Sequence, residues 1–202
     1  MSEIKSILSA QTSLKEKTSG SISNAEPVAY ISTEPKEKYY VIDTNIIIDN
    51  PDIIPTKNGF KKLAIKNIDL KNSCIVIPDT VLHELKSFRS ESSERSFIAG
   101  KVINRIDELQ QSVLDNQDKL GRDPHINIGN QIAFKNCSRA FMVIKSSESA
   151  TISWDFEPVN MDEQIFLQTL NLAYCLKSKQ AKNELDALNK KIRLVTNDKE
   201  MR

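Results

Sequence analysis

The sequence predicts an α/β sandwich built on a parallel sheet, and three observations predict it. Short runs rich in β-branched and aromatic residues occur at 39–42, 73–77 and 192–195. Segments with apolar residues at helical spacing, 81–88 and 98–113, lie between them. Strands that alternate with helices pair in parallel and are covered by those helices. The chain has 202 residues, of which 39% are hydrophobic, and this size suits one domain plus some disordered length.

The first 38 residues differ in composition from the rest of the chain. Residues 1–38 contain eight Ser, five Lys and five Glu, but no Asp or Arg. Their apolar residues do not repeat at helical spacing, and such segments lack the apolar surface that a packed core requires. We therefore expect a disordered Ser/Lys/Glu-rich tail at 1–38 and a folded domain at 39–202.

Each element of this domain has its own signal. The strand at 39–42 ends in Asp43, and the strand at 73–77 is closed by a Pro. Apolar residues on one side of 81–88 predict a helix that carries Glu84 at the shoulder of its apolar stripe. The following helix is predicted from apolar residues three and four positions apart, namely Ile98, Val102, Ile106, Leu109 and Val113.

The alternation of strands and helices is interrupted at residues 115–158. Gly and Pro break this segment, which also contains two short apolar runs at 132–135 and 140–144. We predict an insertion here that holds a hairpin of these two strands. Beyond it, Asn160 with Glu163 three residues later is a variant of the capping box and predicts the start of a helix.

Composition and motifs exclude several function classes. The chain has 28 Lys+Arg and 27 Asp+Glu, so nucleic-acid binding would need local patches rather than a global positive charge. No phosphate-binding loop of the GxxxxGK[ST] type is present, and His83-Glu84 lacks the second His of a zinc-protease motif. No apolar run is long enough to span a bilayer, so no membrane partner is expected.

The cysteines indicate the compartment. Cys74, Cys137 and Cys175 are odd in number and contain no CxxC pair. We interpret them as free thiols in a reducing compartment, and we therefore expect the protein to be cytoplasmic. The sequence leaves open whether the chain forms a homo-oligomer.

Four carboxylates occupy positions where parallel α/β sheets bind ligands, at and beyond the carboxyl ends of strands. They are Asp43, Glu84, Asp162 and Asp198. Carboxylates about 4 Å apart repel by roughly 4 kcal/mol at an effective dielectric constant near 20, so a shared pocket would require a proton or a divalent cation. Oxygen ligands favour Mg²⁺ or Mn²⁺. Each acid alone is also explained by a structural role, such as capping a turn or favouring a helix N-terminus.

The motifs around these acids resemble those of PIN domains. The matching segments are Tyr40–Asn45, Val76–Leu85, Asp162–Ile165 and Val195–Lys199, in that order and over about residues 38–202. Their spacing and the Thr-Asn-Asp ending are most similar to the PIN domain that precedes PhoH-type ATPases. The resemblance implies a three-layer α/β/α sandwich with a central parallel sheet, and a ribonuclease that depends on Mg²⁺ or Mn²⁺.

The resemblance also implies a role for individual residues. The acidic quartet that holds the metal and carries the catalysis maps onto Asp43, Glu84, Asp162 and Asp198, with Thr44, Asn45 and Thr196 as supporting polar residues. Compared with the family pattern, the chain ends shortly after the last acid. We therefore expect a truncated C-terminus: the chain is either a fragment of a longer protein with a following ATPase domain, or a chain that has lost that domain. RNA is the partner that the resemblance implies.

Candidate residues for RNA binding give a less specific signal. Residues 57–71 carry five Lys and one Asp. The candidates for phosphate contacts are Lys57, Lys61, Lys62, Arg89 and Arg95, although a solvated loop or helix face explains the lysines equally well. Trp154 and Phe156 are candidates for base stacking, with core or loop packing as the simpler interpretation.

Two other function classes are compatible with the residues. A phosphatase of the haloacid-dehalogenase type would use Asp43 as nucleophile, but it requires a second Asp at position 45, which is Asn. A catalytically weak or inactive PIN module would act in RNA binding or protein interaction, and loss of an acidic ligand would be its signature. All four acids are present. A toxin-type PIN nuclease is a more compact variant of the first interpretation.

Overall fold

The computed structural model describes residues 29–32, 34–61, 70–90, 92–118, 131–144, 157–178 and 191–197, apart from the side chains of 116–118, 175, 177 and 178. These residues form a six-stranded sheet in the order β1-β4-β5-β3-β2-β6. The strands are β1 (Ala29–Ser32), β2 (Lys38–Ile42), β3 (Ser73–Pro78), β4 (Gln131–Phe134), β5 (Ala140–Ile144) and β6 (Ile192–Val195).

The pairing confirms the predicted parallel core of the sheet. Strand β2 pairs in parallel with both β3 and β6, and β3 pairs in parallel with β5. Strands β4 and β1 extend the sheet with antiparallel pairs, so the whole sheet is mixed. The four parallel strands end at one edge, which we call the carboxyl edge.

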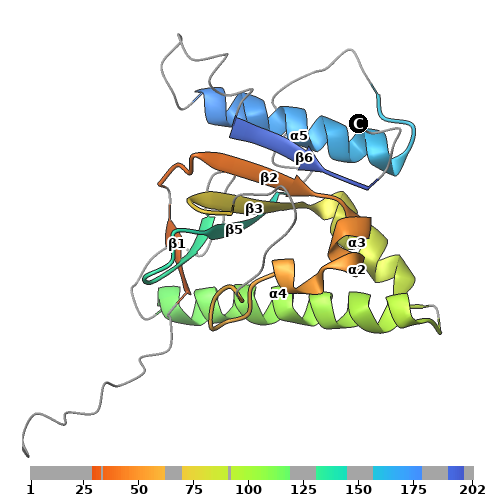
Figure 1. Ribbon diagram of the computed structural model, residues 1–202, viewed down its shortest axis with the longest axis horizontal. Coiled ribbons are helices and arrows are strands. Elements are labelled where there is room, and N and C mark those ends of the chain that lie inside the picture. Colours follow the sequence, from red (N-terminus) through yellow and green to blue (C-terminus); the bar gives the residue numbers. More distant parts are fainter. Residues whose placement is uncertain are drawn as a thin grey trace, which may run out of the picture.

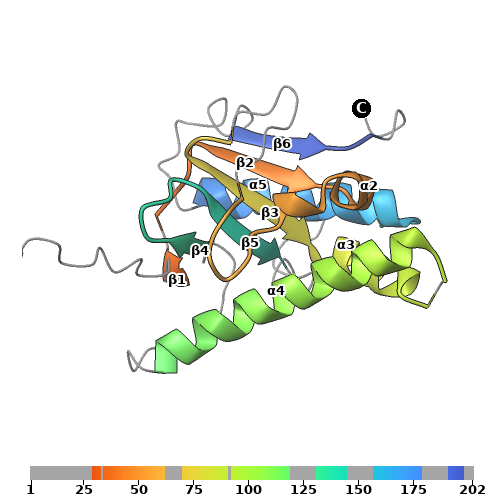
Figure 2. The same ribbon diagram turned by 60° about the horizontal axis from the view of Figure 1, so that its bottom comes forward.

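Helices cover both faces of the sheet and complete the predicted three-layer α/β/α sandwich. Helix α4 (Glu94–Asp118) lies on one face and α5 (Met161–Ser178) on the other, while α2 (Thr44–Asp49) and α3 (Asp79–Phe88) lie at the carboxyl edge (Figure 1). A short 3₁₀ helix, η1 (Pro51–Ile53), follows α2. Figure 2 shows α4 running along the whole face below the sheet.

Most of the apolar residues that recur at helical or strand spacing in the sequence are buried in the core. Four members of the predicted α4 stripe are fully buried, namely Val102, Ile106, Leu109 and Val113. Strand β3 is buried at every position, as expected for a central parallel strand covered on both faces. In the described residues, no helix has both the length and the apolar character needed to cross a bilayer.

The predicted start of the folded domain is too late. Residues 29–32 form β1 rather than a disordered tail, and Ala29 is 1% exposed. The register pairs Ala29 with Phe134 and Ser32 with Gln131. A four-residue strand carries almost no periodic signal of its own, so only pairing with β4 defines it. Residues 1–28 lie outside the described residues, and disorder there stays a prediction.

The predicted hairpin exists, but it is not a peripheral insertion. Strands β4 and β5 pair antiparallel, and β5 also pairs with β3 over Cys74–Pro78. Residues 115–118 belong to the end of α4. The segment 115–158 therefore supplies two strands of the central sheet, and its residues 119–130 and 145–156 lie outside the described residues.

The cysteine prediction is confirmed where the structure describes it. Cys74 and Cys137 are free thiols. Cys74 is fully buried in β3, and this burial raises the pKa of its thiol. The side chain of Cys175 lies outside the described residues.

A buried arginine joins η1 to helix α4. The Nη1 of Arg105 donates to the Pro51 carbonyl and to Asp52 Oδ1, both at 2.9 Å, and the Arg105 residue is 9% exposed. Lys61 Nζ also donates to Asp52 Oδ1, at 3.0 Å. The hydrogen bond from Lys61 is the largest cause that holds the pKa of Asp52 below its ordinary value of 3.8. Burial opposes it, and the hydrogen bond from Arg105 lowers the pKa further.

These contacts predict a pH-dependent contribution of Asp52 to stability. A carboxylate whose pKa is lowered by folding stabilises the fold above its unfolded pKa and loses that contribution as the pH falls through the folded pKa. We expect Asp52→Asn to lower the free energy of unfolding at pH 7, and the difference from wild type to shrink as the pH falls below 3.8. Urea unfolding over a pH series measures this, and a pH-independent difference would contradict the assignment.

Candidate active site

Asp43 is the first residue after β2, and it caps the N-terminus of α2. It is 4% exposed, and its Oδ1 accepts a hydrogen bond from the Thr44 backbone N–H at 2.6 Å. Its Oδ2 accepts from the Thr196 hydroxyl at 2.9 Å. Asp is a preferred N-cap because its carboxylate satisfies a backbone N–H that has no partner within the helix. The two hydrogen bonds fix the orientation of a buried carboxylate.

The contact between Asp43 and Thr196 follows from the sheet register. Strands β2 and β6 are parallel neighbours, and Ile42 pairs with Val195. The next residue of each strand therefore lies at the same level of the carboxyl edge. The Asp43 backbone N–H also donates to the Val195 carbonyl at 3.1 Å, which continues the pairing past the strand ends.

A second hydrogen bond ties the segment after β6 to α2. Asn197 Nδ2 donates to Asp49 Oδ2 at 2.9 Å. Together with the bond from Thr196 to Asp43, it anchors two consecutive residues of this segment to both ends of α2. Neither Asp49 nor Asn197 is among the site residues predicted from the sequence. An acid in the last turn of a short helix carries no signal that would reveal such a contact.

Glu84 reaches the same site from α3. This helix begins directly after β3, the neighbour of β2, so it starts at the carboxyl edge. Glu84 is half-buried, and its Oε2 accepts a hydrogen bond from the hydroxyl of buried Thr44. The structure thus brings together Asp43, Thr44, Glu84 and Thr196 at the carboxyl edge. Asn45 is exposed on α2, and within the described residues its side chain makes no hydrogen bond to this group.

Asp162 lies at the start of α5 and is exposed. The predicted cap is confirmed, because Asn160 Oδ1 accepts from the Glu163 N–H at 2.8 Å. The return bond differs from a standard capping box, since Glu163 Oε2 accepts from the N–H of Val159 at 2.6 Å rather than from that of Asn160. Helix α5 begins at the end of the molecule where β2 and β3 end, near α3 (Figure 1).

Three of the four predicted metal ligands, Asp43, Glu84 and Asp162, lie in the described residues. Asp198 lies outside them, and they contain no group of three His, Cys, Asp or Glu side chains that could hold a metal ion. Asp162 therefore does not form such a group with Asp43 and Glu84 here. The donors that do gather are carboxylate and hydroxyl oxygens, which are the ligand type that Mg²⁺ and Mn²⁺ prefer.

The candidate RNA-binding residues fall into two locations. Arg89 and Arg95 are exposed where α3 ends and α4 begins, beyond Glu84 along α3. Lys61 lies elsewhere, because its carbonyl accepts from Arg139 Nη2 at 3.2 Å and Arg139 directly precedes β5, at the opposite edge of the sheet. Lys57 is exposed, and Lys62, Trp154 and Phe156 lie outside the described residues.

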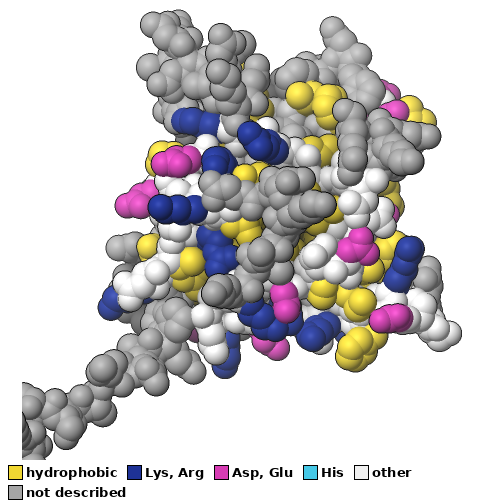
Figure 3. Space-filling model, in the orientation of Figure 1, with side chains coloured by type: hydrophobic (Ala, Val, Ile, Leu, Met, Phe, Trp, Pro, Cys, Tyr) yellow, Lys and Arg dark blue, Asp and Glu magenta, His cyan; other side chains and the backbone are white. Residues whose placement is uncertain are grey.

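The distribution of surface charge agrees with the separation of Lys61 from Arg89 and Arg95. On the face seen in Figure 3, Lys and Arg side chains lie mainly over the half where β2 and β3 begin, with Asp and Glu among them. The Lys61 ammonium is paired with Asp52, and Arg139 packs over the Phe60 ring at 4.5 Å from its centroid. The lysine-rich stretch after η1 is thus partly engaged in local contacts on that side.

A further polar contact joins α5 to α3 and was not predicted. Gln168 Nε2 donates to Asp79 Oδ1, and the Gln168 residue is 5% exposed. Asp79 is the first residue of α3. An Asp in the first turn of a helix is sufficiently explained by the helix dipole, so the sequence gives no sign of this contact.

Comparison with known proteins agrees with this architecture. The family model for the PIN domain matches residues 40–202, which is most of the chain and includes the four acids predicted from the sequence. No curated protein gives a significant match. PIN domains have a nuclease-type fold and usually use Mg²⁺ or Mn²⁺. The chain therefore belongs to the PIN domain family.

Proposed function

We propose that this chain is a metal-dependent ribonuclease that hydrolyses RNA phosphodiester bonds at the carboxyl edge of the sheet. The observation that carries the proposal is the buried carboxylate of Asp43, which is held by Thr44 and Thr196 beside Glu84. The proposed catalytic and metal-binding residues are Asp43, Glu84, Asp162 and Asp198. Asp43 and Glu84 both accept hydrogen bonds from Thr44, and a divalent cation would relieve the repulsion between two neighbouring carboxylates.

Chain connectivity supports the inclusion of Asp198. Thr196 and Asn197 are hydrogen-bonded to Asp43 and Asp49, and Asp198 is the next residue. For Asp162, the support is its place in the first turn of α5 at the same end of the molecule.

The chain's own residues would have distinct tasks in hydrolysis. Asp43, Asp162 and Asp198 would hold one or two ions, and Glu84 would hold an ion through water or orient the nucleophile. When bound, such an ion lowers the pKa of a bound water and neutralises the developing phosphoryl charge. Thr196 would keep the Asp43 carboxylate in one orientation. Cleavage of this type leaves a 5′-phosphate and a 3′-hydroxyl.

The RNA backbone would approach past the junction of α3 and α4. Arg89 and Arg95 are exposed there and are the candidates for phosphate contacts. The spacing of the acidic motifs supports assignment to the subgroup of PIN domains that precede PhoH-type ATPases. Free Cys74 and Cys137 support a reducing, cytoplasmic location.

A cleavage assay with end analysis tests this function. Wild-type protein is incubated with end-labelled single-stranded RNA in Mg²⁺, in Mn²⁺ and with EDTA. The proposal predicts products with 5′-phosphate ends in the presence of either metal and none with EDTA. Cleavage that continues in EDTA, or intact RNA under every condition, would contradict it.

The hydroxyl of Thr196 gives a prediction about the positioning of Asp43. Thr196→Val keeps the shape of the side chain but removes the donor to Asp43 Oδ2. Loss of such a supporting hydrogen bond typically costs roughly 10- to 100-fold in activity or metal affinity. We expect a loss of this size in cleavage rate, and Thr196→Ser, which retains the hydroxyl, should keep most of the activity. Equal rates for the Val and Ser variants would show that the hydroxyl has no positioning role.

A further inference from the structure

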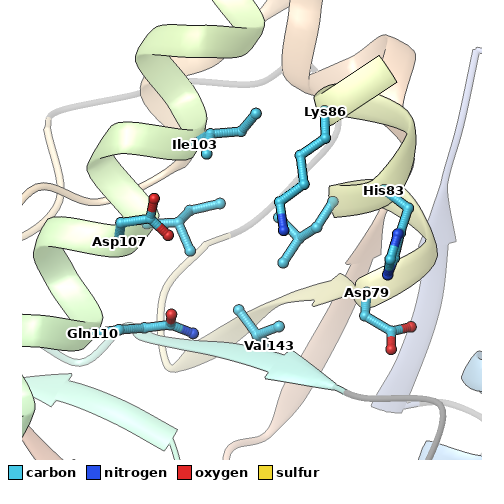
Figure 4. A pocket seen from close by; sticks show the side chains of 9 residues that line it. Asp79, His83, Lys86, Ile103, Asp107, Gln110 and Val143 are labelled. Atoms are coloured by element: carbon cyan, nitrogen blue, oxygen red, sulfur yellow. The ribbon is translucent and has the colours of Figure 1, made fainter. Parts of the chain in front are cut away.

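A pocket of about 280 Å³ lies on the opposite side of α3 from Glu84. Its walls are α3 and α4, and Val143 of β5 lies at its base (Figure 4). This volume is close to the lower end of the range for small-molecule sites. It is separate from the acidic site, which is formed by α2, α3 and β6.

The lining combines an apolar body with a polar rim. Four aliphatic side chains form the apolar part, namely Leu82, Ile103, Ile106 and Val143. Lys86 extends from α3 into the space, and Asp107 and Gln110 extend toward it from α4 (Figure 4). Within the described part of the chain, no hydrogen bond or ion pair engages the side chains of these three polar residues. The pocket therefore presents charged and amide groups that are available to a ligand.

The α3 wall of the pocket is fixed in place by α5. Asp79 lines the pocket, and its Oδ1 accepts from Gln168 Nε2. The position of α3 also determines where Glu84 meets Thr44. One helix thus contributes Glu84 to the acidic site and Lys86 to the pocket.

The chemistry of the lining fits a nucleobase better than a wholly polar ligand. A flat ring with apolar faces can pack against aliphatic side chains, while its edge requires hydrogen-bond partners. A carboxylate accepts N–H bonds from an exocyclic amino group, and a Gln amide both donates and accepts along a base edge. A Lys ammonium provides a point charge for a neighbouring phosphate. Single-stranded RNA is the usual source of unpaired bases that a protein can read in this way.

We propose that this pocket binds an unpaired RNA base that carries an exocyclic amino group. Asp107 accepts the amino group, Gln110 contacts the same edge and Lys86 contacts the adjacent phosphate. The proposal rests on the proposed nuclease function only for the choice of RNA as the ligand. The base preference itself is a binding property of the chain without metal.

Binding of short homopolymers in EDTA tests the proposal without catalysis. Fluorescence anisotropy with labelled oligo(A), oligo(C) and oligo(U) compares two bases that carry an exocyclic amino group with one that does not. We expect oligo(A) and oligo(C) to bind about tenfold more tightly than oligo(U), as for one good contact to a base edge. Equal affinities for the three, or no binding to any of them, would overturn the assignment.

Two variants with matched controls identify the residues responsible. Asp107→Ala should bring the affinities for oligo(A) and oligo(C) to the level of oligo(U), whereas Glu108→Ala, an exposed neighbour outside the pocket, should preserve the preference. Lys86→Ala should weaken the binding of all three oligonucleotides about equally and should reduce the slope of log K against log salt concentration by about one. Lys101→Ala should change these affinities little. Thermal melts confirm that each variant is folded.

Two outcomes separate this proposal from the nuclease assignment. A base preference in EDTA without cleavage in Mg²⁺ or Mn²⁺ would retain the pocket and refute the nuclease. Cleavage of RNA by a wild-type protein that shows no base preference would support the nuclease assignment and refute the base-binding pocket. An Asp107→Ala variant that keeps the base preference would also refute the pocket and would leave the nuclease assignment unaffected.

Discussion

Asp43→Asn is expected to abolish metal-dependent RNA cleavage, with a loss of roughly a hundredfold or more, while leaving the domain folded. Asn is about as good an N-cap as Asp, and its amide oxygen can still accept from the Thr44 N–H. The substitution therefore preserves the local structure and removes the negative charge that a divalent ion requires. The cleavage rate in Mg²⁺ and Mn²⁺, together with the melting temperature, measures both effects.

A matched control for this experiment is Asp115→Asn, which removes the charge of an exposed acid on α4. This variant should cleave RNA at the wild-type rate. Full activity of Asp43→Asn in Mn²⁺ would contradict the role of Asp43. A large fall in its melting temperature would show instead that the charge of Asp43 is needed for folding.

Phe141→Ala is expected to lower the free energy of unfolding by about 3–5 kcal/mol, the usual cost of removing a buried aromatic side chain. Phe141 is 0% exposed in β5, where it pairs with Ile75 of β3 and Ile132 of β4. Such a loss is a large part of the roughly 5–15 kcal/mol that stabilises a typical domain. Denaturant unfolding measures it.

Phe97→Ala is the control, because Phe97 is 74% exposed on α4. Substitution of an exposed residue usually changes stability by no more than about 0.5 kcal/mol. The comparison tests whether β5 belongs to the central sheet. If residues 115–158 were a peripheral insertion, Phe141→Ala would leave the unfolding of the remaining domain nearly unchanged.

The sequence predicts most of the sandwich because its elements have strong periodicity. The apolar stripe from Val102 to Val113 predicts a helix, and the apolar run of β3 predicts a buried strand. The structure contains both. Helix α2 was not predicted, because Ile46, Ile47 and Ile48 are β-branched residues that continue the pattern of the strand before them. The helix forms because Asp43 caps it and because Ile46 and Ile47 are buried.

The candidate site is predictable only in part, for a physical reason. Strand ends indicate that Asp43 and Thr196 share the carboxyl edge, because parallel neighbours end at the same edge. The contact between Thr44 and Glu84 depends on how α3 lies against α2, which no local pattern specifies. The same limit explains why the pairing of Lys61 with Asp52 and the α3–α4 pocket could not be predicted.

A crystal structure in Mn²⁺ tests whether the carboxyl edge holds a metal ion, because anomalous scattering identifies the ion independently of the protein density. We expect Mn²⁺ at the carboxyl edge, with oxygens of Asp43 and Asp198 about 2.1 Å from the ion and Glu84 nearby. Asp43 and Asp198 pointing away from each other, with no Mn²⁺ between them at saturating concentration, would contradict it.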